Sequence, residues 1–99
     1  MAYLVGKSTV ADFEKWHSSF KDNESFRTEN GETGYQVFQS VDDPDEIVVI
    51  FQWDENEDPR AFFQSEGMRE RMADAGLTGP PDLTLVELVD QKMARQPSA

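Results

Sequence analysis

The feature that most constrains the fold is the segment 47–53, which reads IVVIFQW. Its β-branched and aromatic residues favour a strand, and successive residues of a strand point to opposite faces of the sheet. Both sets of alternate residues are apolar: Ile47, Val49, Phe51 and Trp53 on one face, and Val48 and Ile50 on the other. A sheet built around this strand must therefore be covered on both faces.

The rest of the chain predicts three more strands around it. Apolar or alternating segments at 2–8, 35–41 and 83–89 are the expected strands. The acidic, proline-containing turn 42–46 joins the second strand to the third, so these two strands are expected to form a hairpin.

A first helix is predicted after the first strand, with Ser8 or Thr9 as its N-cap and an end near residues 22–23. Its apolar side chains recur at helical spacing, which predicts one buried face. That face comprises Val10, Phe13, Trp16, His17 and Phe20. The polar stretch 24–32 that follows is expected to be a loop.

A second helical region is predicted to start at the Asp-Pro pair 58–59, a capping carboxylate followed by the residue best suited to the first helical position. An unbroken helix would place its apolar side chains on opposite faces. Ser65 is therefore expected to cap a second piece, giving helices at 59–64 and 66–75. Gly76 supplies the expected left-handed C-cap.

The order β-α-β-β-α-β predicts an α+β, ferredoxin-like fold with a four-stranded antiparallel sheet. One domain is expected over 1–90, followed by a loose tail at 91–99. Right-handed crossovers place both helical regions on one face of the sheet. The other apolar face then needs a partner, and two copies packed sheet to sheet as a homodimeric α/β barrel provide one. An ordinary half-buried sheet with a few exposed apolar residues is the alternative.

The net charge of −11, from 20 acidic and 9 basic residues, argues against nucleic acid or an anionic membrane surface as partners. Such a surface keeps a protein soluble, and adaptation to a saline habitat is the other interpretation. The absence of cysteine excludes disulfides, a thiolate nucleophile and a zinc–sulfur site. No apolar run approaches the roughly 20 residues of a membrane span, and no signal peptide is evident, so a cytoplasmic protein is expected.

Several residues along the whole order of elements resemble one family. They are the run VADFEKW at 10–16, Arg27, Gly31, Val37-Phe38, Asp42-Asp43-Pro44, Phe51-Gln52-Trp53-Asp54, Met72, Ala75-Gly76 and Gly79-Pro80-Pro81. Over roughly 2–90 the chain resembles the small dimeric α/β-barrel proteins called antibiotic-biosynthesis-monooxygenase-like or cyclase-like. The resemblance implies a ligand pocket between the sheet and the helices, and oxidation of aromatic substrates without metal or flavin. Heme-degrading relatives use a histidine on the second helix, and residues 59–75 contain none.

Candidate catalytic residues follow from this resemblance. His17 is the only histidine, so a multi-histidine metal site is excluded, and it is the candidate general base. Arg27, in the expected polar loop, and Tyr35 are candidates for orienting substrate oxygens. Each of the three has an ordinary structural role as its alternative. The segment 54–58 starts like a calcium loop but has Pro59 where glycine is required, so no metal site is predicted.

The expected pocket would suit a flat apolar ligand if space remains between its aromatic and methionine side chains. Its expected lining consists of Trp16, Trp53, Phe62, Met68 and Met72, with Gln52 as a polar contact. The same apolar residues would otherwise form core. The leading hypothesis is a small cofactor-independent monooxygenase or cyclase that acts on an apolar aromatic or enolisable molecule. A non-catalytic binding or stress-response dimer is the alternative, and a purely structural dimer is the third.

Overall fold

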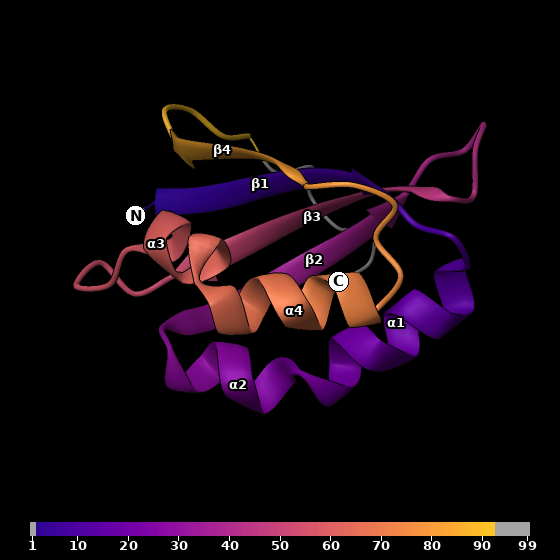
Figure 1. The fold of residues 1–99 in the computed structure, drawn as a ribbon. Coiled ribbons are helices and arrows are strands. Elements are labelled where there is room, and N and C mark those ends of the chain that lie inside the picture. The colour runs from indigo at the N-terminus through magenta and orange to yellow at the C-terminus, as the bar shows by residue number, and fades with distance from the viewer. Residues whose placement is uncertain (1, 93–99) are drawn as a thin grey trace, which may run out of the picture.

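The computed structural model describes residues 2–92 and contains four strands and four helices. They follow in the order β1 Ala2–Thr9, α1 Phe13–Asp22, α2 Glu24–Glu29, β2 Glu32–Gln39, β3 Glu46–Trp53, α3 Pro59–Gln64, α4 Glu66–Asp74 and β4 Asp82–Glu87. The strands form one antiparallel sheet in the order β2-β3-β1-β4. All the helices lie on one face of this sheet (Figure 1). The predicted α+β, ferredoxin-like fold is confirmed.

The core lies between the sheet and the helices, where the predicted alternation along β3 holds. Ile47, Val49, Phe51 and Trp53 are all buried on the helix side. At the centre of the sheet, Leu4 pairs with Phe51 on one neighbouring strand and Leu85 on the other, and its side chain is fully buried. The two central strands therefore supply the layer of apolar side chains on which every helix packs.

Helix α1 begins later than predicted. Its N-cap is Asp12, which has extended backbone dihedrals and whose carboxylate accepts a hydrogen bond from the backbone N–H of Lys15. Residues before it continue the strand direction, because Val10 forms a β-bridge with Leu77 and is buried. The expectation of a cap at Ser8 or Thr9 was wrong because this bridge takes the chain past both residues before a helix can start.

The stretch expected to be a polar loop is helical over Glu24–Glu29, so that expectation was also wrong. The short helix is anchored by Arg27, whose side chain is fully buried. It ends at Glu29 with Asn30 as its C-cap, and the next residue, Gly31, has a positive φ of 121° and lies close to the indole of Trp53. A charged side chain that faces inward is the reason the apolar pattern gave no sign of this helix.

The predicted break in the second helical region is confirmed. Ser65 ends α3 and caps α4, and its hydroxyl accepts a hydrogen bond from the backbone N–H of Met68. At the far end Gly76 has a φ of 95°, and its N–H donates to the carbonyl of Ala73 while the N–H of Leu77 donates to that of Met72. These bonds form the left-handed cap expected after residue 75.

Two strands end earlier than predicted. Strand β2 ends at Gln39 because the hydroxyl of Ser40 accepts hydrogen bonds from the backbone N–H groups of Asp42 and Asp43, which starts the turn. Val41 is 98% exposed and Val89, beyond the end of β4, is 94% exposed. Strand β2 in turn starts three residues early, at Glu32, through an irregular pairing with the end of β3.

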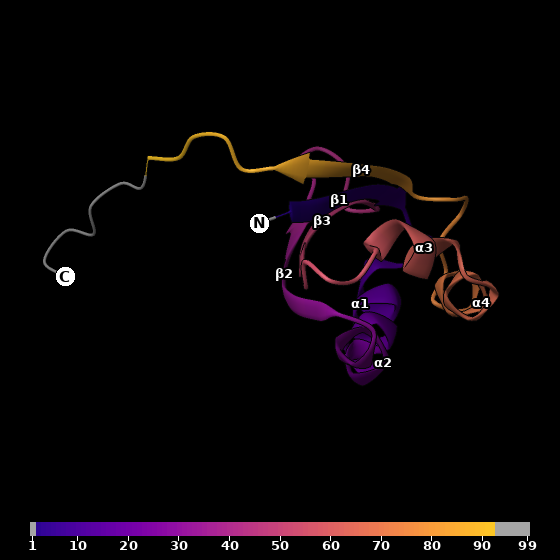
Figure 2. The same cartoon turned by 90° about the vertical axis from the view of Figure 1, so that its left-hand side faces the viewer.

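The second face of the sheet carries no helix among the described residues (Figure 2). Its apolar side chains include half-buried residues on the central strands and the exposed Phe38 and Leu88, at 48% and 54%. None of the helices that the structure describes is long and apolar enough to cross a membrane. The expected tail lies, from residue 93 onward, outside the described part of the chain.

Candidate functional site

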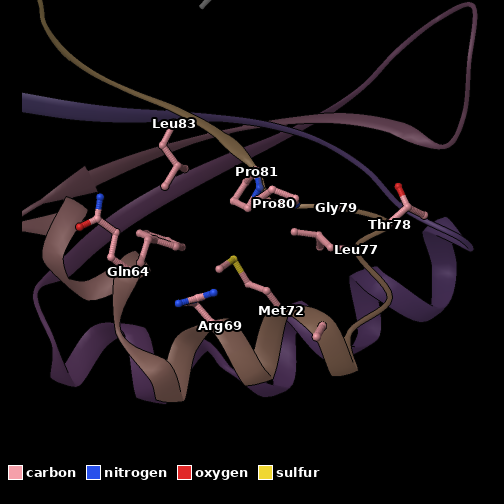
Figure 3. Close-up of a pocket in the computed structure, with 11 residues that line it drawn as sticks. Gln64, Arg69, Met72, Leu77, Thr78, Gly79, Pro80, Pro81 and Leu83 are labelled. Atoms are coloured by element: carbon pink, nitrogen blue, oxygen red, sulfur yellow. The ribbon is translucent and has the colours of Figure 1, made fainter.

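A cleft of about 690 Å³ opens between α4 and the start of β4 (Figure 3). Side chains from α4 form one wall, and the connector that leads into β4 forms the other. The lining comprises Phe63, Gln64, Arg69, Met72, Ala73, Leu77, Thr78, Gly79, Pro80, Pro81 and Leu83. This volume is within the range of small-molecule sites.

The local sequence explains why this side stays open. The break at Ser65 turns α4 away from α3, and α4 itself buries only Met68. The connector cannot collapse onto the helix, because Pro80 and Pro81 have fixed φ angles and lack backbone donors. Thr78 holds its start in place, since its backbone N–H and its hydroxyl both donate to the carbonyl of Thr9.

A smaller hollow of about 50 Å³ adjoins the cleft on the core side. The two share Phe63, Met72, Leu77, Pro81 and Leu83, so these side chains lie between the hollow and the cleft. Its remaining lining is almost entirely apolar: Gly6, Ser8, Trp16, Phe20, Ile47, Val49, Phe51 and Met68. A cavity of this kind favours the apolar part of a ligand over water.

The structure distributes the predicted pocket residues over three places. Trp16, Met68 and Met72 line the hollow. Trp53 and Phe62 are buried in the core, with ring centroids 5.2 Å apart, and contribute to neither cavity. Gln52 points to the opposite face of the sheet, where it lines a shallow groove; its expected place in the helix-side pocket was wrong because the strand alternation turns it away.

The three candidate catalytic residues do not meet around the cleft. His17 is half-buried on α1 and stacks on Phe13 and Trp16, with ring centroids 5.4 and 6.2 Å apart. It is absent from the lining of both the cleft and the hollow. Its role as a general base stays a prediction, and only its contact with Trp16 connects it to the site.

Arg27 and Tyr35 lie together in a buried polar cluster at the other end of the helix layer. The Nε of Arg27 donates to Glu32 at 2.7 Å, its Nη1 donates to the carbonyl of Phe20 at 2.8 Å, and its guanidinium lies 3.7 Å from the centre of the Phe20 ring. Its Nη2 has no hydrogen-bond partner among residues 2–92. The expected position of Arg27 in a polar loop was wrong, because the residue lies on α2 and these contacts hold its side chain in the core.

Burial raises the pKa of two groups in this polar cluster. It raises the pKa of Glu32, although the hydrogen bond and positive charge of Arg27 act in the opposite direction. Burial also raises the pKa of Tyr35, and the nearby carboxylate of Glu24 adds to the effect. A phenol with a raised pKa keeps its proton at neutral pH, so Tyr35 is suited to donating a hydrogen bond rather than to removing a proton.

Sequence reasoning missed the polar residues of the cleft, namely Gln64, Arg69 and Thr78. The predicted break at Ser65 was a usable signal, since it places Arg69 in the first turn of a new helix. Within the described residues, no three histidine, aspartate or glutamate side chains converge as a metal site would require.

Comparison with known proteins places this chain in a family. Residues 8–74 match the model of the antibiotic biosynthesis monooxygenases. The chain belongs to the antibiotic biosynthesis monooxygenase family. The match takes in every element from the end of β1 to the end of α4, so it includes the helix wall of the cleft.

Several solved structures are similar in fold to this chain. A candidate family member from Bordetella bronchiseptica has a TM-score of 0.73 at 14% identity, over 89% of this chain and 96% of that one. SnoaB, a cofactor-independent oxygenase from Streptomyces nogalater, has a TM-score of 0.71 at 19% identity, over 91% and 94%. A candidate member from Nitrosomonas europaea has 0.66 at 18% identity, over 91% and 100%. No curated protein matches the chain. At these identities the likeness shows the fold.

Proposed function

We propose that this protein is a cofactor-independent oxygenase that acts on an apolar aromatic or enolisable small molecule in the cleft beside α4. The observation that carries the proposal is the pairing of a 690 Å³ cleft with a 50 Å³ apolar hollow on the helix side of the sheet. SnoaB, which shares the fold, is a cofactor-independent oxygenase, and its likeness supports the same class of reaction.

The proposed chemistry balances with substrate and dioxygen alone. A phenol loses its proton, and the electron-rich ring carbon passes electrons to O₂ and forms a C–O bond. The resulting hydroperoxide loses water and leaves a second carbonyl, so one oxygen atom enters the product quinone and the other leaves in water. The chain's part is to bind the substrate, to orient it and to exclude bulk water.

Oxygen consumption with a panel of naphthols and anthrones tests the proposal. Turnover is expected from the wild type, and Ala73→Trp should lower kcat/KM about tenfold or more because the indole occupies the cleft. Ala61→Trp is the matched control, since Ala61 is an exposed helix residue outside the cleft lining. Equal activity in both variants, or no turnover of any compound, contradicts the proposal.

The base is a separate question from the function. If His17 removes the substrate proton, His17→Ala lowers kcat while the far-ultraviolet circular dichroism and the melting temperature stay close to wild type. Full activity in that folded variant removes His17 from the mechanism and leaves the oxygenase proposal standing. Saturable binding of the panel without oxygen uptake instead favours the alternative, a non-catalytic small-molecule-binding or stress-response protein.

We also infer that the protein forms a homodimer through the helix-free face of the sheet. A shallow groove of about 810 Å³ runs over this face, lined in part by Tyr3, Val5, Ile50, Val86 and Leu88. Apolar surface of this kind is rare on soluble monomers. A second sheet packed on this face would bury the apolar side chains that the helices, on the other face, leave uncovered.

Sedimentation equilibrium at micromolar concentration tests this inference. A mass of twice 11.3 kDa is expected for the wild type, and Ile50→Glu is expected to give the single-chain mass because it places a charge in the interface. Ser18→Glu, on the exposed side of α1, adds the same charge away from the face and should stay dimeric. A wild type at 11.3 kDa overturns the inference.

A further inference from the structure

Arg69 differs from the other arginines that the structure describes. Arg27 is paired with Glu32, Arg60 lies 3.8 Å from Asp58, and Arg71 donates to Asn23 and stacks on Phe26. Arg69 has no ion pair and no side-chain hydrogen bond within residues 2–92. Glu66 and Glu70 lie near it on α4, but neither carboxylate is within ion-pair distance.

The charge of the cleft lining contrasts with the charge of the chain. The sequence has 20 acidic residues, yet among residues 2–92 none of them lines the cleft and Arg69 is its one charged side chain. A protein with a net charge of −11 repels anions at long range. Any anion that it binds must therefore be held by a local cation, and Arg69 supplies one in the cleft. Glu66 and Glu70 line an adjoining hollow that shares Gln64 and Arg69 with the cleft, so both carboxylates lie outside the cleft lining itself.

The cleft has polar side chains at both ends, because Thr78 lies at the end opposite to Gln64, and apolar side chains lie between them (Figure 3). Gln64, at the end of α3, and Arg69, in the first turns of α4, lie toward the same end (Figure 3). Leu83 lies above this end, Met72 and Leu77 continue the walls, and the adjoining hollow is lined in part by Trp16. This arrangement matches a molecule with an acidic group at one end and a flat apolar body.

We propose that Arg69 makes the cleft selective for aromatic acids, with the guanidinium and the amide of Gln64 binding the carboxylate and the ring system lying on Met72 toward the hollow. The guanidinium fork matches a carboxylate in a bidentate geometry, which a neutral amide does not reproduce. The proposal rests on the proposed function for the location of the site, and it adds the substrate class and the residue that selects it.

Isothermal titration with 2-naphthoate and its neutral analogue 2-naphthamide tests this selectivity. The wild type should bind the acid about tenfold more tightly than the amide, the equivalent of about 1.4 kcal/mol. Arg69→Gln should remove that preference and leave the affinity for 2-naphthamide within about twofold. Arg60→Gln is the control, because it deletes the same charge from an exposed helix position outside the cleft and should keep the preference.

Three results would overturn the proposal: equal affinity of the wild type for both compounds, an intact preference in Arg69→Gln, or no binding of either compound at millimolar concentration. A failure of the aromatic-acid proposal can be distinguished from a failure of the oxygenase proposal. Oxygen uptake with neutral naphthols that Arg69→Gln leaves unchanged, together with equal binding of acid and amide, would contradict the aromatic-acid assignment alone. Arg69-dependent binding of 2-naphthoate without any oxygen uptake would contradict the oxygenase alone.

Discussion

The two ends of the helix layer differ in where they place an arginine side chain. At the closed end, around α2 and the start of β2, Arg27 is buried against Glu32 and the ring of Phe20. At the cleft end, around α4 and the connector into β4, Arg69 lies at the edge of an open space and has no ion-pair partner in the described part of the chain. One end uses its arginine to hold the fold together, and the other leaves its arginine available to a ligand.

The difference follows from the size and shape of the neighbouring residues. Large rings fill the closed end, where Phe20 and Tyr35 meet edge to face with centroids 4.9 Å apart. The cleft end has Ala73 on the helix and Gly79, Pro80 and Pro81 on the connector, which are too small or too rigid to fill the gap. Substitutions should therefore act mainly on stability at the closed end and mainly on binding at the cleft end.

The largest effect is expected from Arg27→Met. Removal of the guanidinium leaves the Glu32 carboxylate buried without its ion pair, so the free energy of unfolding should fall by about 3–5 kcal/mol in urea titrations. The double variant Arg27→Met/Glu32→Met should recover most of the loss, because it removes both buried charges. Arg71→Met, with its partners at the surface, should cost less than about 1 kcal/mol. A cost as small for Arg27→Met would mean that the closed end is not held by this pair.

A second contrast uses the two glycines with positive φ. At the closed end, a Cβ on Gly31 would lie 2.5 Å from Nε1 of Trp53 and 2.9 Å from Cβ of Glu57, so Gly31→Ala should cost about 3 kcal/mol or more. At the cleft end, a Cβ on Gly76 would meet nothing within 4 Å, so Gly76→Ala should cost only the backbone strain, about 1 kcal/mol. Thermal melts of both variants give the comparison. Equal costs would show that packing at Gly31 adds nothing to the strain.

The smallest expected effect is a change in the stability of the fold with pH. Burial raises the pKa of Glu32 in the folded protein above its unfolded value, near 4.5. The folded state therefore binds this proton more tightly, and the contribution of Glu32 to stability is greatest below pH 4.5 and is lost as pH rises through the folded pKa. The stability of the wild type relative to Glu32→Gln should accordingly fall between pH 4 and pH 7 in urea titrations. A relative stability that rises over this range would show that Arg27, rather than burial, dominates the titration.

Much of the fold was predictable because its signals are local. The alternation in β3, the Asp-Pro start of α3, the Ser65 break and the Gly76 cap each depend on a few adjacent residues. The family resemblance was also visible in the sequence, and the family match confirms it.

The errors at Arg27 and Arg69 share a physical cause, which is that the neighbours of each side chain are set only when the chain folds. Arg27 was placed in a loop because its partner, Glu32, and its stacking ring, Phe20, become neighbours only on folding. Arg69 was missed because a cleft is defined by the connector opposite it, and no pattern within α4 records that connector. Gln52 was expected as a polar contact of the pocket, and the strand alternation instead turns it to the helix-free face of the sheet.

The single-residue break at Ser65 has a consequence for how such a protein can change over time. Phe62 and Phe63 anchor α3 in the core, whereas α4 buries only Met68 and is otherwise held by its caps, by Met72 and by the contacts of Arg71 with Asn23 and Phe26. Mutations on α4 can alter what the cleft accepts without disturbing the layer that stabilises the sheet. The fold thus separates the residues that selection must preserve from those that it can vary, which is a favourable starting point for the evolution of new substrate preferences.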